Sequence, residues 1–262
     1  MTFSLDEFHA VALEAARLGG ERTLKYFNQG VAVEYKGDHT PVTCADRESE
    51  QIIRERIQKS FPSHSIVGEE GGVTKGDDSF KWIIDPIDGT KSFIHGVPLY
   101  GVLIGVEIEG RASVGVVYLP ALGEIVSAAV GRGCFWNGKP CQVSKVEKLS
   151  EATLLSSSIM SSIERSDAYE RLASKTKLQR TWGDCYGYVL VATGRAEIML
   201  DPRMNPWDSA PFLPIMTEAG GCFTDWTGKA TIWGRDGVAT NALLFEDVIR
   251  VLKTEKRKPH TL

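Results

Sequence analysis

Two aspartates, Asp85 and Asp88, stand three residues apart at the end of an apolar run, and Gly89-Thr90 follows directly. The run over residues 82–84 indicates a buried strand, and Pro86 predicts its end because proline cannot continue a ladder. Neighbouring carboxylates repel, so they stay ionised only beside positive charge, and a divalent cation is the simplest source. The backbone N–H groups of Gly89-Thr90 suit an anionic oxygen. The segment therefore predicts a site for metal and phosphate.

Further acids elsewhere in the chain could complete this site: Asp46, Glu69 and Glu70 between glycines, and Asp208 after Pro206-Trp207. Two or three Mg²⁺ ions need several carboxylate oxygens and room for water and a phosphate. A two-metal site holds its cations about 4 Å apart and clamps the attacking and leaving oxygens. On this interpretation Asp85 bridges two ions, and Glu69 and Asp88 each add a ligand. Asp208 would close the site from the other half of the chain.

Each acid taken singly also has a structural interpretation. Asp88-Gly89 is a common turn dipeptide, and an acid such as Asp208 often caps a helix. Glu69-Glu70 alone is typical of a solvated loop. The joint pattern of paired acids after two neighbouring strands, a Gly-Thr and a further acid after Trp207 favours a metal-dependent phosphate site.

Helices and strands that would position these acids follow from residue periodicity. Residues 5–28 and 44–60 have the spacing of amphipathic helices, with Thr43 placed to cap the second and Asp46 in its first turn. Short β-branched or aromatic runs indicate strands over 31–35, 65–67, 81–84, 100–109, 112–118 and 124–130. Turns are indicated at 109–111 and at Asn137-Gly138. We expect helices followed by an antiparallel meander.

The second half alternates between strands and helices, which predicts a layered α/β arrangement. The expected strands are 153–158, 179–182, 196–200, 222–225 and 239–241, and the expected helices are 166–174, 186–193, 209–219 and 245–252. A polar stretch over 143–152 separates the halves. We therefore predict an N-terminal half, 1–145, with the metal-binding loops, and a C-terminal half, 146–262, that completes the metal and substrate site.

Four motifs in this order resemble those of the inositol monophosphatase-like superfamily of Mg²⁺-dependent phosphatases. Residues 82–90 are similar to its first signature, and residues 207–210 running on to 218–221 to its second. Gly68-Glu69-Glu70 and residues 40–46 match its other two blocks. The resemblance covers most of the chain. It implies the α/β sandwich of alternating helix and sheet layers, αβαβα, of the inositol monophosphatase/fructose-1,6-bisphosphatase fold, and a homodimer.

The resemblance also implies a role for each motif residue. Glu69, Asp85 and the backbone carbonyl of Ile87 would hold one Mg²⁺, and Asp85, Asp88 and Asp208 a second, with a weaker third ion near Glu69. Asp46 and Thr90, assisted by Glu70, would position and deprotonate a metal-bound water. The amides of Gly89 and Thr90 would bind the phosphate.

Substrate choice is expected to depend on the second half. Asp184 stands where inositol-selective members carry small uncharged residues, and Asp201 and Asn205 precede Asp208, a combination similar to the histidinol-phosphate phosphatase branch. Histidinol phosphate carries an ammonium and an imidazole, which these acids and the amide could bind. Inositol would leave a buried acid unpaired. Asp88, Asp208 and Cys185 are also placed at this substrate site, although Cys185 fits a small packing residue better than a nucleophile.

The alternative is structural. Asp184 would then cap the helix over 186–193, and Asp201 would merely end a strand. The choice between these interpretations decides the substrate but not the chemistry.

Composition excludes several classes. The 262 residues carry a formal net charge of −4, which argues against a nucleic-acid partner, and no apolar run reaches the length of a membrane span. The N-terminus lacks the basic region of a secretory signal, and five cysteines without a CxxC pair indicate thiols in a reducing compartment. We expect a cytoplasmic protein whose basic residues 253–258 form a solvated tail.

The sequence thus predicts a Mg²⁺-dependent phosphomonoesterase acting on L-histidinol phosphate in histidine biosynthesis. The nearest alternative is an inositol monophosphatase or a broad sugar-phosphate phosphatase. A catalytically inactive regulatory binding protein is the alternative from another class, and the intact set of acids argues against it.

Overall fold

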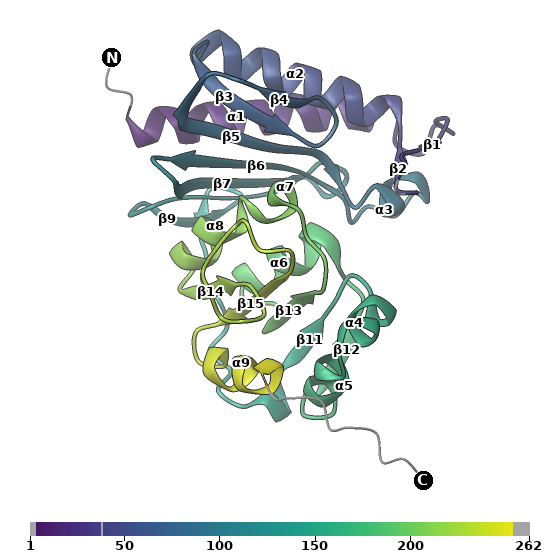
Figure 1. Cartoon of the computed structure of the whole chain (residues 1–262), viewed down its shortest axis with the longest axis vertical. Coiled ribbons are helices and arrows are strands. Elements are labelled where there is room, and N and C mark those ends of the chain that lie inside the picture. The colour runs from purple at the N-terminus through teal and green to yellow at the C-terminus, as the bar shows by residue number, and fades with distance from the viewer. Residues whose placement is uncertain (1–3, 38, 254–262) are drawn as a thin grey trace.

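The computed structural model describes residues 4–37 and 39–253, which stack in five alternating layers (Figure 1). Within these residues, helices α1 (Leu5–Leu24) and α2 (Cys44–Ser60) cover the outer face of an eight-stranded sheet. A second helical layer separates this sheet from a five-stranded one, and a third covers the far face of the smaller sheet. The αβαβα arrangement implied by the resemblance is confirmed.

The larger sheet has the strand order β10-β9-β8-β7-β6-β5-β3-β4 in the described chain. Its strands are β3 (His64–Gly68), β4 (Gly72–Thr74), β5 (Asp77–Asp88), β6 (Gly101–Ile108), β7 (Arg111–Leu119), β8 (Glu124–Ala129), β9 (Gly133–Trp136) and β10 (Lys139–Pro140). From β5 to β10 the strands form the expected antiparallel meander, but β3 pairs parallel with β5. The glycine-flanked loop after β3 turns the chain into β4, so β5 returns on the other side of β3.

The smaller sheet has the order β12-β11-β13-β15-β14 in the part of the chain described. Its strands are β11 (Thr153–Leu155), β12 (Leu178–Arg180), β13 (Ile198–Asp201), β14 (Gly221–Thr224) and β15 (Gly237–Asn241). β11 pairs parallel with β12 and β13, whereas β15 pairs antiparallel with β13 and β14. A short ribbon, β1 (Glu34–Tyr35) with β2 (Pro41–Val42), lies apart from both sheets.

The remaining helices divide between the inner and outer layers. Between the sheets lie α6 (Asp184–Ala192), α7 (Pro206–Ser209) and α8 (Phe212–Glu218). The outer layer on the smaller sheet contains α4 (Ile159–Arg165), α5 (Ala168–Ala173) and α9 (Phe245–Lys253). The short α3 (Thr90–Ile94) follows β5, and 3₁₀ turns lie at Pro120–Leu122 and Leu149–Glu151.

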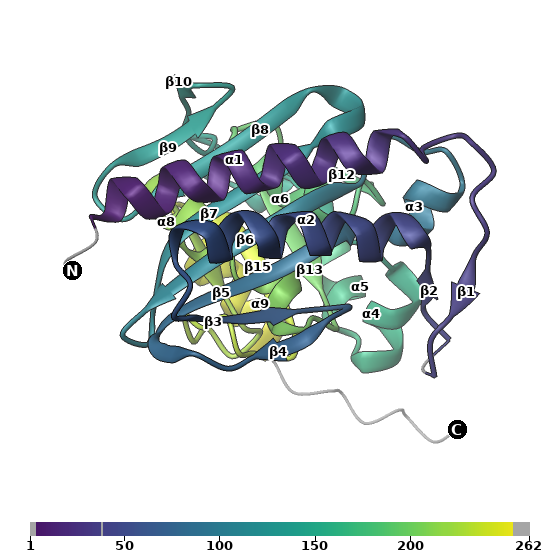
Figure 2. The ribbon, with the colours of Figure 1, turned by 90° about the horizontal axis from the view of Figure 1, so that it is seen from above.

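The first two helices both begin with a capping box, and Thr43 is the cap that the sequence predicts for the second. Ser4 and Glu7 form a capping box at α1, and Thr43 with Asp46 forms another at α2. Figure 2 shows the two helices side by side across the sheet. Their buried faces, with Phe8 and Ile53 fully enclosed, pack on β5, β6 and β7. This packing fixes the orientation of α2, whose first turn carries Asp46.

One hydrophobic core joins the two halves of the chain. Leu103 and Val117 of the larger sheet lie in the same buried cluster as Tyr188 and Phe212 of the inner helices. The division of the chain into halves between residues 145 and 146 stays a prediction, because this core contains residues from both sides of it. Residues 141–148, which connect the sheets, form no helix or strand.

Two glycines let the inner helices come close to the larger sheet. Gly105 and Gly115 are cross-strand partners on β6 and β7. A Cβ on Gly105 would lie 2.4 Å from the Cβ of Ala210, and one on Gly115 would lie 2.1 Å from the carbonyl oxygen of Pro211. The corner between α7 and α8 therefore docks where the sheet has no side chains, which carries Asp208 to the end of β5.

The prediction that a strand ends before Pro86 was wrong. β5 continues to Asp88, with a shift in its register against β6 between Asp85 and Asp88. Proline is tolerated at such an irregularity, because no ladder hydrogen bond is required of it there. The irregularity turns both aspartates toward the same cavity.

Other boundaries differ from those expected. Only residues 34 and 35 of the predicted strand 31–35 are in a strand. The strand expected over 153–158 ends at Leu155, and Ser158 caps α4, a helix that was not predicted. The helix expected over 209–219 is divided into α7 and α8, because Pro211 has no N–H to continue the first helix. α3 was also not predicted.

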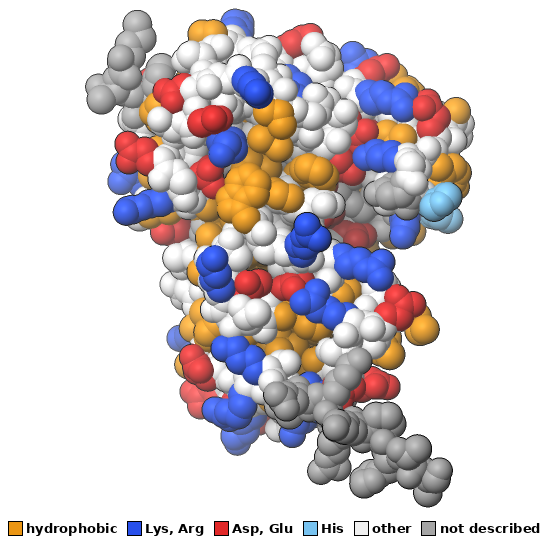
Figure 3. Space-filling view, viewed as in Figure 1, with side chains coloured by type: hydrophobic (Ala, Val, Ile, Leu, Met, Phe, Trp, Pro, Cys, Tyr) orange, Lys and Arg blue, Asp and Glu red, His pale blue; other side chains and the backbone are white. Residues whose placement is uncertain are grey.

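Acidic and basic side chains are interspersed over one face of the molecule, and apolar side chains gather near the β4 edge of the larger sheet (Figure 3). No helix among the described residues is both long enough and apolar enough to span a bilayer. Residues 254–258 of the basic C-terminal stretch lie outside the described residues.

Candidate active site

Three aspartates from two regions of the chain converge where β5 ends. Carboxylate oxygens of Asp85, Asp88 and Asp208 all lie within 4.8 Å of one another. Each side chain is oriented by a backbone amide: Ile87 N donates to Asp85 at 3.0 Å, Cys185 N to Asp88 at 2.5 Å, and Asn205 N to Asp208 at 2.7 Å. The remaining oxygens form a compact set of hard donors.

Burial and mutual repulsion both act against ionisation of this aspartate cluster. Burial raises the pKa of Asp85 well above its ordinary value, and the charges of Glu69, Asp88 and Asp208 raise it further. Burial likewise raises the pKa of Asp88, and it raises that of Asp208 to about 7. A hard divalent cation would relieve the repulsion, and the all-oxygen donor set fits Mg²⁺. These residues can therefore hold a metal ion.

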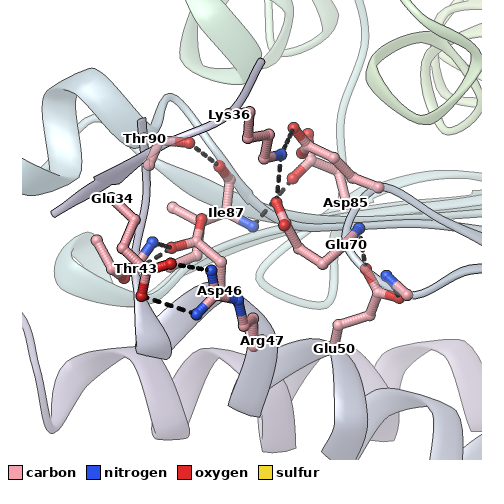
Figure 4. A network of polar contacts seen from close by, with 12 residues as sticks. Glu34, Lys36, Thr43, Asp46, Arg47, Glu50, Glu70, Asp85, Ile87 and Thr90 are labelled. Carbon is pink, nitrogen blue, oxygen red and sulfur yellow. Dashed lines mark hydrogen bonds and ion pairs between the residues drawn. The ribbon is translucent and has the colours of Figure 1, made fainter. Parts of the chain in front are cut away.

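Glu69 and Glu70 border this cluster from the loop after β3. The ammonium of Lys36 lies 2.7 Å from Glu69 Oε1 and 2.5 Å from Glu70 Oε1 (Figure 4). Burial raises the pKa of Glu70, partly against the effect of Lys36. Sequence reasoning missed Lys36, because nothing in its neighbourhood indicates that the β1–β2 ribbon folds back onto this loop.

A buried ion pair on α2, between Glu50 and Arg54, holds the loop that follows β3. Glu50 accepts hydrogen bonds from Glu70 N at 2.8 Å and Gly71 N at 2.9 Å, and Arg54 Nε donates to Glu50 at 2.6 Å. Arg54 also donates to the carbonyl oxygen of Gly72 at 2.6 Å. A Cβ at Gly68 would lie 2.2 Å from Glu50 Oε1, so glycine is required for this approach. This Glu50–Arg54 brace was also missed, although Glu50 lies one helical turn after Asp46.

Asp46 lies in the first turn of α2, close enough to Glu69 for that carboxylate's charge to raise its pKa. Its Oδ2 accepts hydrogen bonds from Thr43 N at 2.8 Å and Thr43 Oγ1 at 2.7 Å (Figure 4). Burial raises its pKa to about 6. The predicted cap, Thr43, and the predicted catalytic acid, Asp46, therefore form one capping box, in which one carboxylate oxygen of Asp46 is bound to Thr43.

Gly89 and Thr90 lie beside the aspartate cluster, directly after β5. Gly89 has φ +80°, a left-handed conformation that favours glycine, and it precedes the first residue of α3. Thr90 Oγ1 donates to the carbonyl oxygen of Ile87 at 3.1 Å. These residues line a cavity of about 200 Å³ together with Glu69, Asp85, Asn205 and Asp208. The cavity is small, polar and open to solvent beside the cluster.

A second cavity of about 170 Å³ adjoins the first, and Asp88, Asp184 and Asp208 line both. Asp184 is the first residue of α6, with φ +50°, and its N–H donates to Ser157 Oγ at 2.7 Å. Its carboxylate lies beside Gly89, where a Cβ would be 3.2 Å from Asp184 Oδ2. Gly183, not Asp184, occupies the N-cap of α6.

Asp201 lines the second cavity at the end of β13 and is 5% exposed. It accepts hydrogen bonds from Ser157 N at 3.1 Å and from the hydroxyl of Tyr188 at 3.0 Å. Burial raises its pKa to about 6. Ser157 thus connects Asp184 and Asp201, which sequence reasoning did not foresee.

The structure brings most of the sequence-predicted site residues to these two cavities, whereas Asp46 and Glu70 line neither and lie close to Glu69. Cys185 contributes its amide to Asp88, but its sulfur is buried in the core, where a Cβ on Gly101 would lie 2.8 Å from it. Asn205 lines the first cavity and presents its amide to Asp208. Asp208 lies within the first turn of α7, where its carboxylate accepts from the backbone N–H of the N-cap residue Asn205 as part of a capping box.

Comparisons with known proteins agree with this geometry. The family model described as the inositol monophosphatase family matches residues 4–257. A histidinol-phosphatase of Chlorobaculum parvum is 45% identical over 94% of this chain and 97% of its own length. A fructose-1,6-bisphosphatase/inositol-1-monophosphatase of Thermotoga maritima is 37% identical over 80% of this chain and 82% of its own.

A comparison with solved structures leads to the same family. The solved structure of an IMPase of Thermotoga maritima superposes with a TM-score of 0.84 at 33% identity, covering 92% of this chain and 94% of that one. The family resemblance inferred from the four motifs is confirmed. The chain belongs to the inositol monophosphatase family.

Proposed function

We propose that this chain is a Mg²⁺-dependent phosphatase that hydrolyses L-histidinol phosphate to L-histidinol and phosphate in histidine biosynthesis. Family membership makes it a phosphoric monoester hydrolase. The observation that carries the choice of substrate is the second cavity, where Asp184 and Asp201 add negative charge directly beside the aspartate cluster. A substrate that joins a phosphate to a cationic group is complementary to both cavities.

The donors available assign the metal ligands. Glu69, Asp85 and the carbonyl oxygen of Ile87 would hold one Mg²⁺, and Asp85, Asp88 and Asp208 a second, with a third near Glu69. Bound Mg²⁺ would supply Lewis acidity, which makes water a stronger acid and neutralises charge on the phosphate. The protein supplies fixed oxygen positions, because backbone amides already orient each aspartate of the cluster.

Other side chains would orient the attacking water and move its proton. Asp46 Oδ2 is bound to Thr43, so Oδ1 is the oxygen that would accept a proton from the water. A pKa of about 6 leaves Asp46 ionised at neutral pH yet basic enough to act. Thr90 Oγ1 and the carboxylate of Glu70 would orient this water. The amides of Gly89 and Thr90 would bind the phosphate oxygens.

The order of the charged groups along histidinol phosphate matches the positions of Asp184 and Asp201. Its ammonium is on the carbon next to the phosphate-bearing one, so an acid that binds it must lie beside the phosphate loop. Asp184 lies there, against Gly89. The imidazole would extend further into the second cavity, toward Asp201, and Asn205 would hydrogen-bond at the rim. Charge-assisted hydrogen bonds of this kind are the stronger ones.

The histidinol-phosphatases among the relatives support this proposal, and those of Mycobacterium tuberculosis and Chlorobaculum parvum are 39% and 45% identical. Relatives named as inositol monophosphatases keep the first alternative open, with about 35% identity. A polyol would offer no charged group to the half-buried Asp184, which disfavours it.

A substrate panel assayed with Mg²⁺ and with a chelator tests the proposal. We expect Mg²⁺-dependent phosphate release, with kcat/KM for L-histidinol phosphate at least about tenfold above that for inositol 1-phosphate. Equal or greater turnover of inositol phosphate would favour the inositol or sugar-phosphate alternative. Absence of Mg²⁺-dependent release from every ester would favour an inactive binding protein.

A further inference from the structure

A pair of cysteines lies far from the aspartate cluster, on the hairpin that ends the larger sheet. Cys134 is in β9, and Cys141 directly follows β10. The register pairs Trp136 with Lys139 and Phe135 with Pro140, so Cys134 and Cys141 are the next cross-strand partners. Cys141 N donates to the carbonyl oxygen of Cys134 at 3.0 Å, and the two sulfurs are 3.5 Å apart.

This geometry is compatible with a covalent bond between the sulfurs. Directly opposed residues in a hydrogen-bonded antiparallel pair have Cα atoms about 5.5 Å apart. Disulfides span Cα separations of about 4.4–6.8 Å, with sulfurs about 2.05 Å apart. The hairpin turn is fixed by Asn137 and Gly138, with φ +51° and +75°, so the pairing is local and rigid. Small rotations of the two side chains would therefore bring the sulfurs together.

The two thiols differ in accessibility. Cys134 is 2% exposed and packs in the core shared by both halves, whereas Cys141 is half-buried. A dissolved reagent would therefore meet Cys141 first. Cys134 lies behind it, at a distance from which it can attack a group carried by Cys141.

Nearby groups favour Cys141 as the attacking sulfur. Its pKa is lowered, mainly because the Cys134 thiol can donate a hydrogen bond to its thiolate and further because of the positive charge of Arg195. Arg195 is held in place by Glu124, at 2.9 Å, and by the ring of Trp136, whose centroid is 4.3 Å from the guanidinium carbon. The same sulfur contact and burial raise the pKa of Cys134. Thiolates, not thiols, attack disulfides.

We propose that Cys134 and Cys141 form a reversible intramolecular disulfide when the folded protein meets a low-molecular-weight disulfide such as oxidised glutathione. The Cys141 thiolate attacks one sulfur of oxidised glutathione, the glutathione disulfide bond breaks, and one glutathione thiolate leaves. Cys134 then loses its proton to solvent and attacks the Cys141 sulfur, which releases the second glutathione. Two protein thiols are oxidised, and one glutathione disulfide is reduced to two thiols.

The disulfide would act at the point where the chain leaves the larger sheet. Cys141 is the first residue of the connecting segment 141–148, and Val143 N, two residues later, donates to the carbonyl oxygen of Ala219 at 3.0 Å. Linking Cys141 to β9 would tether this segment to the first sheet. The site is thus a modification site on the connection between the two halves, and it does not depend on the proposed phosphatase activity.

Intact mass spectrometry of the whole native protein tests the proposal. After incubation with oxidised glutathione, we expect the wild type to lose two hydrogen atoms, and a non-reducing peptide map should link Cys134 to Cys141. Dithiothreitol should restore the original mass. A stable glutathione adduct without the link, a link between other cysteines, or no change of mass would each overturn the proposal.

Variants separate the two roles. Cys134→Ser should keep glutathione attached to Cys141, because no second thiol is present to release it. Cys141→Ser should abolish formation of the link, whereas Cys222→Ser, which removes a half-buried cysteine elsewhere, should leave its rate unchanged. If Cys134→Ser does not fold, the wild-type peptide map and the other two variants still decide the question. If Cys141→Ser lost two hydrogen atoms as fast as the wild type, another cysteine pair would carry the disulfide, and this result would contradict the proposal.

Discussion

The aspartate cluster and the second cavity both bury carboxylates, but the protein surrounds them differently. Oxygens of Asp85, Asp88 and Asp208 lie within 4.8 Å of one another, and burial together with the charges of neighbouring carboxylates raises the pKa of all three. Asp201 instead accepts hydrogen bonds from Ser157 N and from the Tyr188 hydroxyl. Repulsion within the first group favours a bound cation, whereas neutral donors partly offset the burial that raises the pKa of Asp201 to about 6. This contrast supports the proposal that the crowded acids bind metal and that Asp201 faces the substrate.

The largest effect should come from removing one charge of the aspartate cluster. Asp88→Asn should lower kcat by several orders of magnitude, because it removes a metal ligand, and should raise the melting temperature in a chelator, because it relieves repulsion. Phosphate release and thermal unfolding measure the two effects. Asp247→Asn, on exposed α9 beside Arg250, is a matched control. Near-normal activity of Asp88→Asn would refute the metal assignment.

Removing charge from the second cavity should change selectivity more than chemistry. Asp184→Ala should lower kcat/KM for L-histidinol phosphate by about 10- to 100-fold, because a charge-assisted hydrogen bond is lost. The loss for inositol 1-phosphate should be much smaller. Steady-state kinetics on both esters measures the ratio, and Asp184→Asn separates charge from shape. An equal loss on both substrates would remove Asp184 from substrate recognition.

The Glu50–Arg54 brace should affect metal affinity without direct contact with the metal. Glu50→Gln would weaken the hydrogen bonds that hold the Glu70 and Gly71 amides, so Mg²⁺ should bind about tenfold more weakly. Isothermal titration with MgCl₂ measures this affinity. Glu55→Gln is the matched control, because Glu55 is exposed on the same helix and bonds to Gln51. Unchanged Mg²⁺ affinity in Glu50→Gln would show that the brace stabilises only the fold.

The smallest effect should be in the pH dependence of stability. In a chelator, the folded pKa of Asp208 is about 7 against an ordinary 3.8, so the folded protein binds this proton more tightly than the unfolded chain. The resulting stabilisation is fully present below about pH 4 and is lost as the pH rises through about 7. The unfolding free energy of the wild type should therefore fall over this range, relative to Asp208→Asn, by about 1 kcal/mol or more.

Urea denaturation at several pH values measures this difference. Saturating Mg²⁺ should remove or reverse the slope, because metal ligands must be ionised. Parallel curves for the two proteins in a chelator would contradict the crowding of charge in the cluster.

The sequence predicted the fold and the aspartate cluster where the relevant residues are contiguous. Asp85, Asp88 and Gly89 stand in one short segment whose spacing carries its own chemistry, and the Thr43 cap of α2 is equally local. Periodicity located most helices and strands, but it could not foresee that β5 passes through Pro86, because the sheet irregularity there depends on β6.

Contacts between distant segments could not be predicted from the sequence. Lys36 meets Glu69 only because the β1–β2 ribbon folds over the loop after β3, and Ser157 meets Asp201 only through the parallel pairing of β11 and β13. Neither partner has a distinctive neighbourhood. Lining residues of the substrate cavity such as Ser157 and Tyr188 were therefore not predicted.

The paired glycines of the larger sheet have a consequence for how the enzyme matures. Asp208 meets Asp85 and Asp88 only when the α7–α8 corner is seated over Gly105 and Gly115. A chain whose halves have not yet docked thus lacks the complete ligand set and would hold metal weakly. An ion bound at the seam would then fasten the two halves together, so the catalyst becomes competent only after its own assembly has been completed.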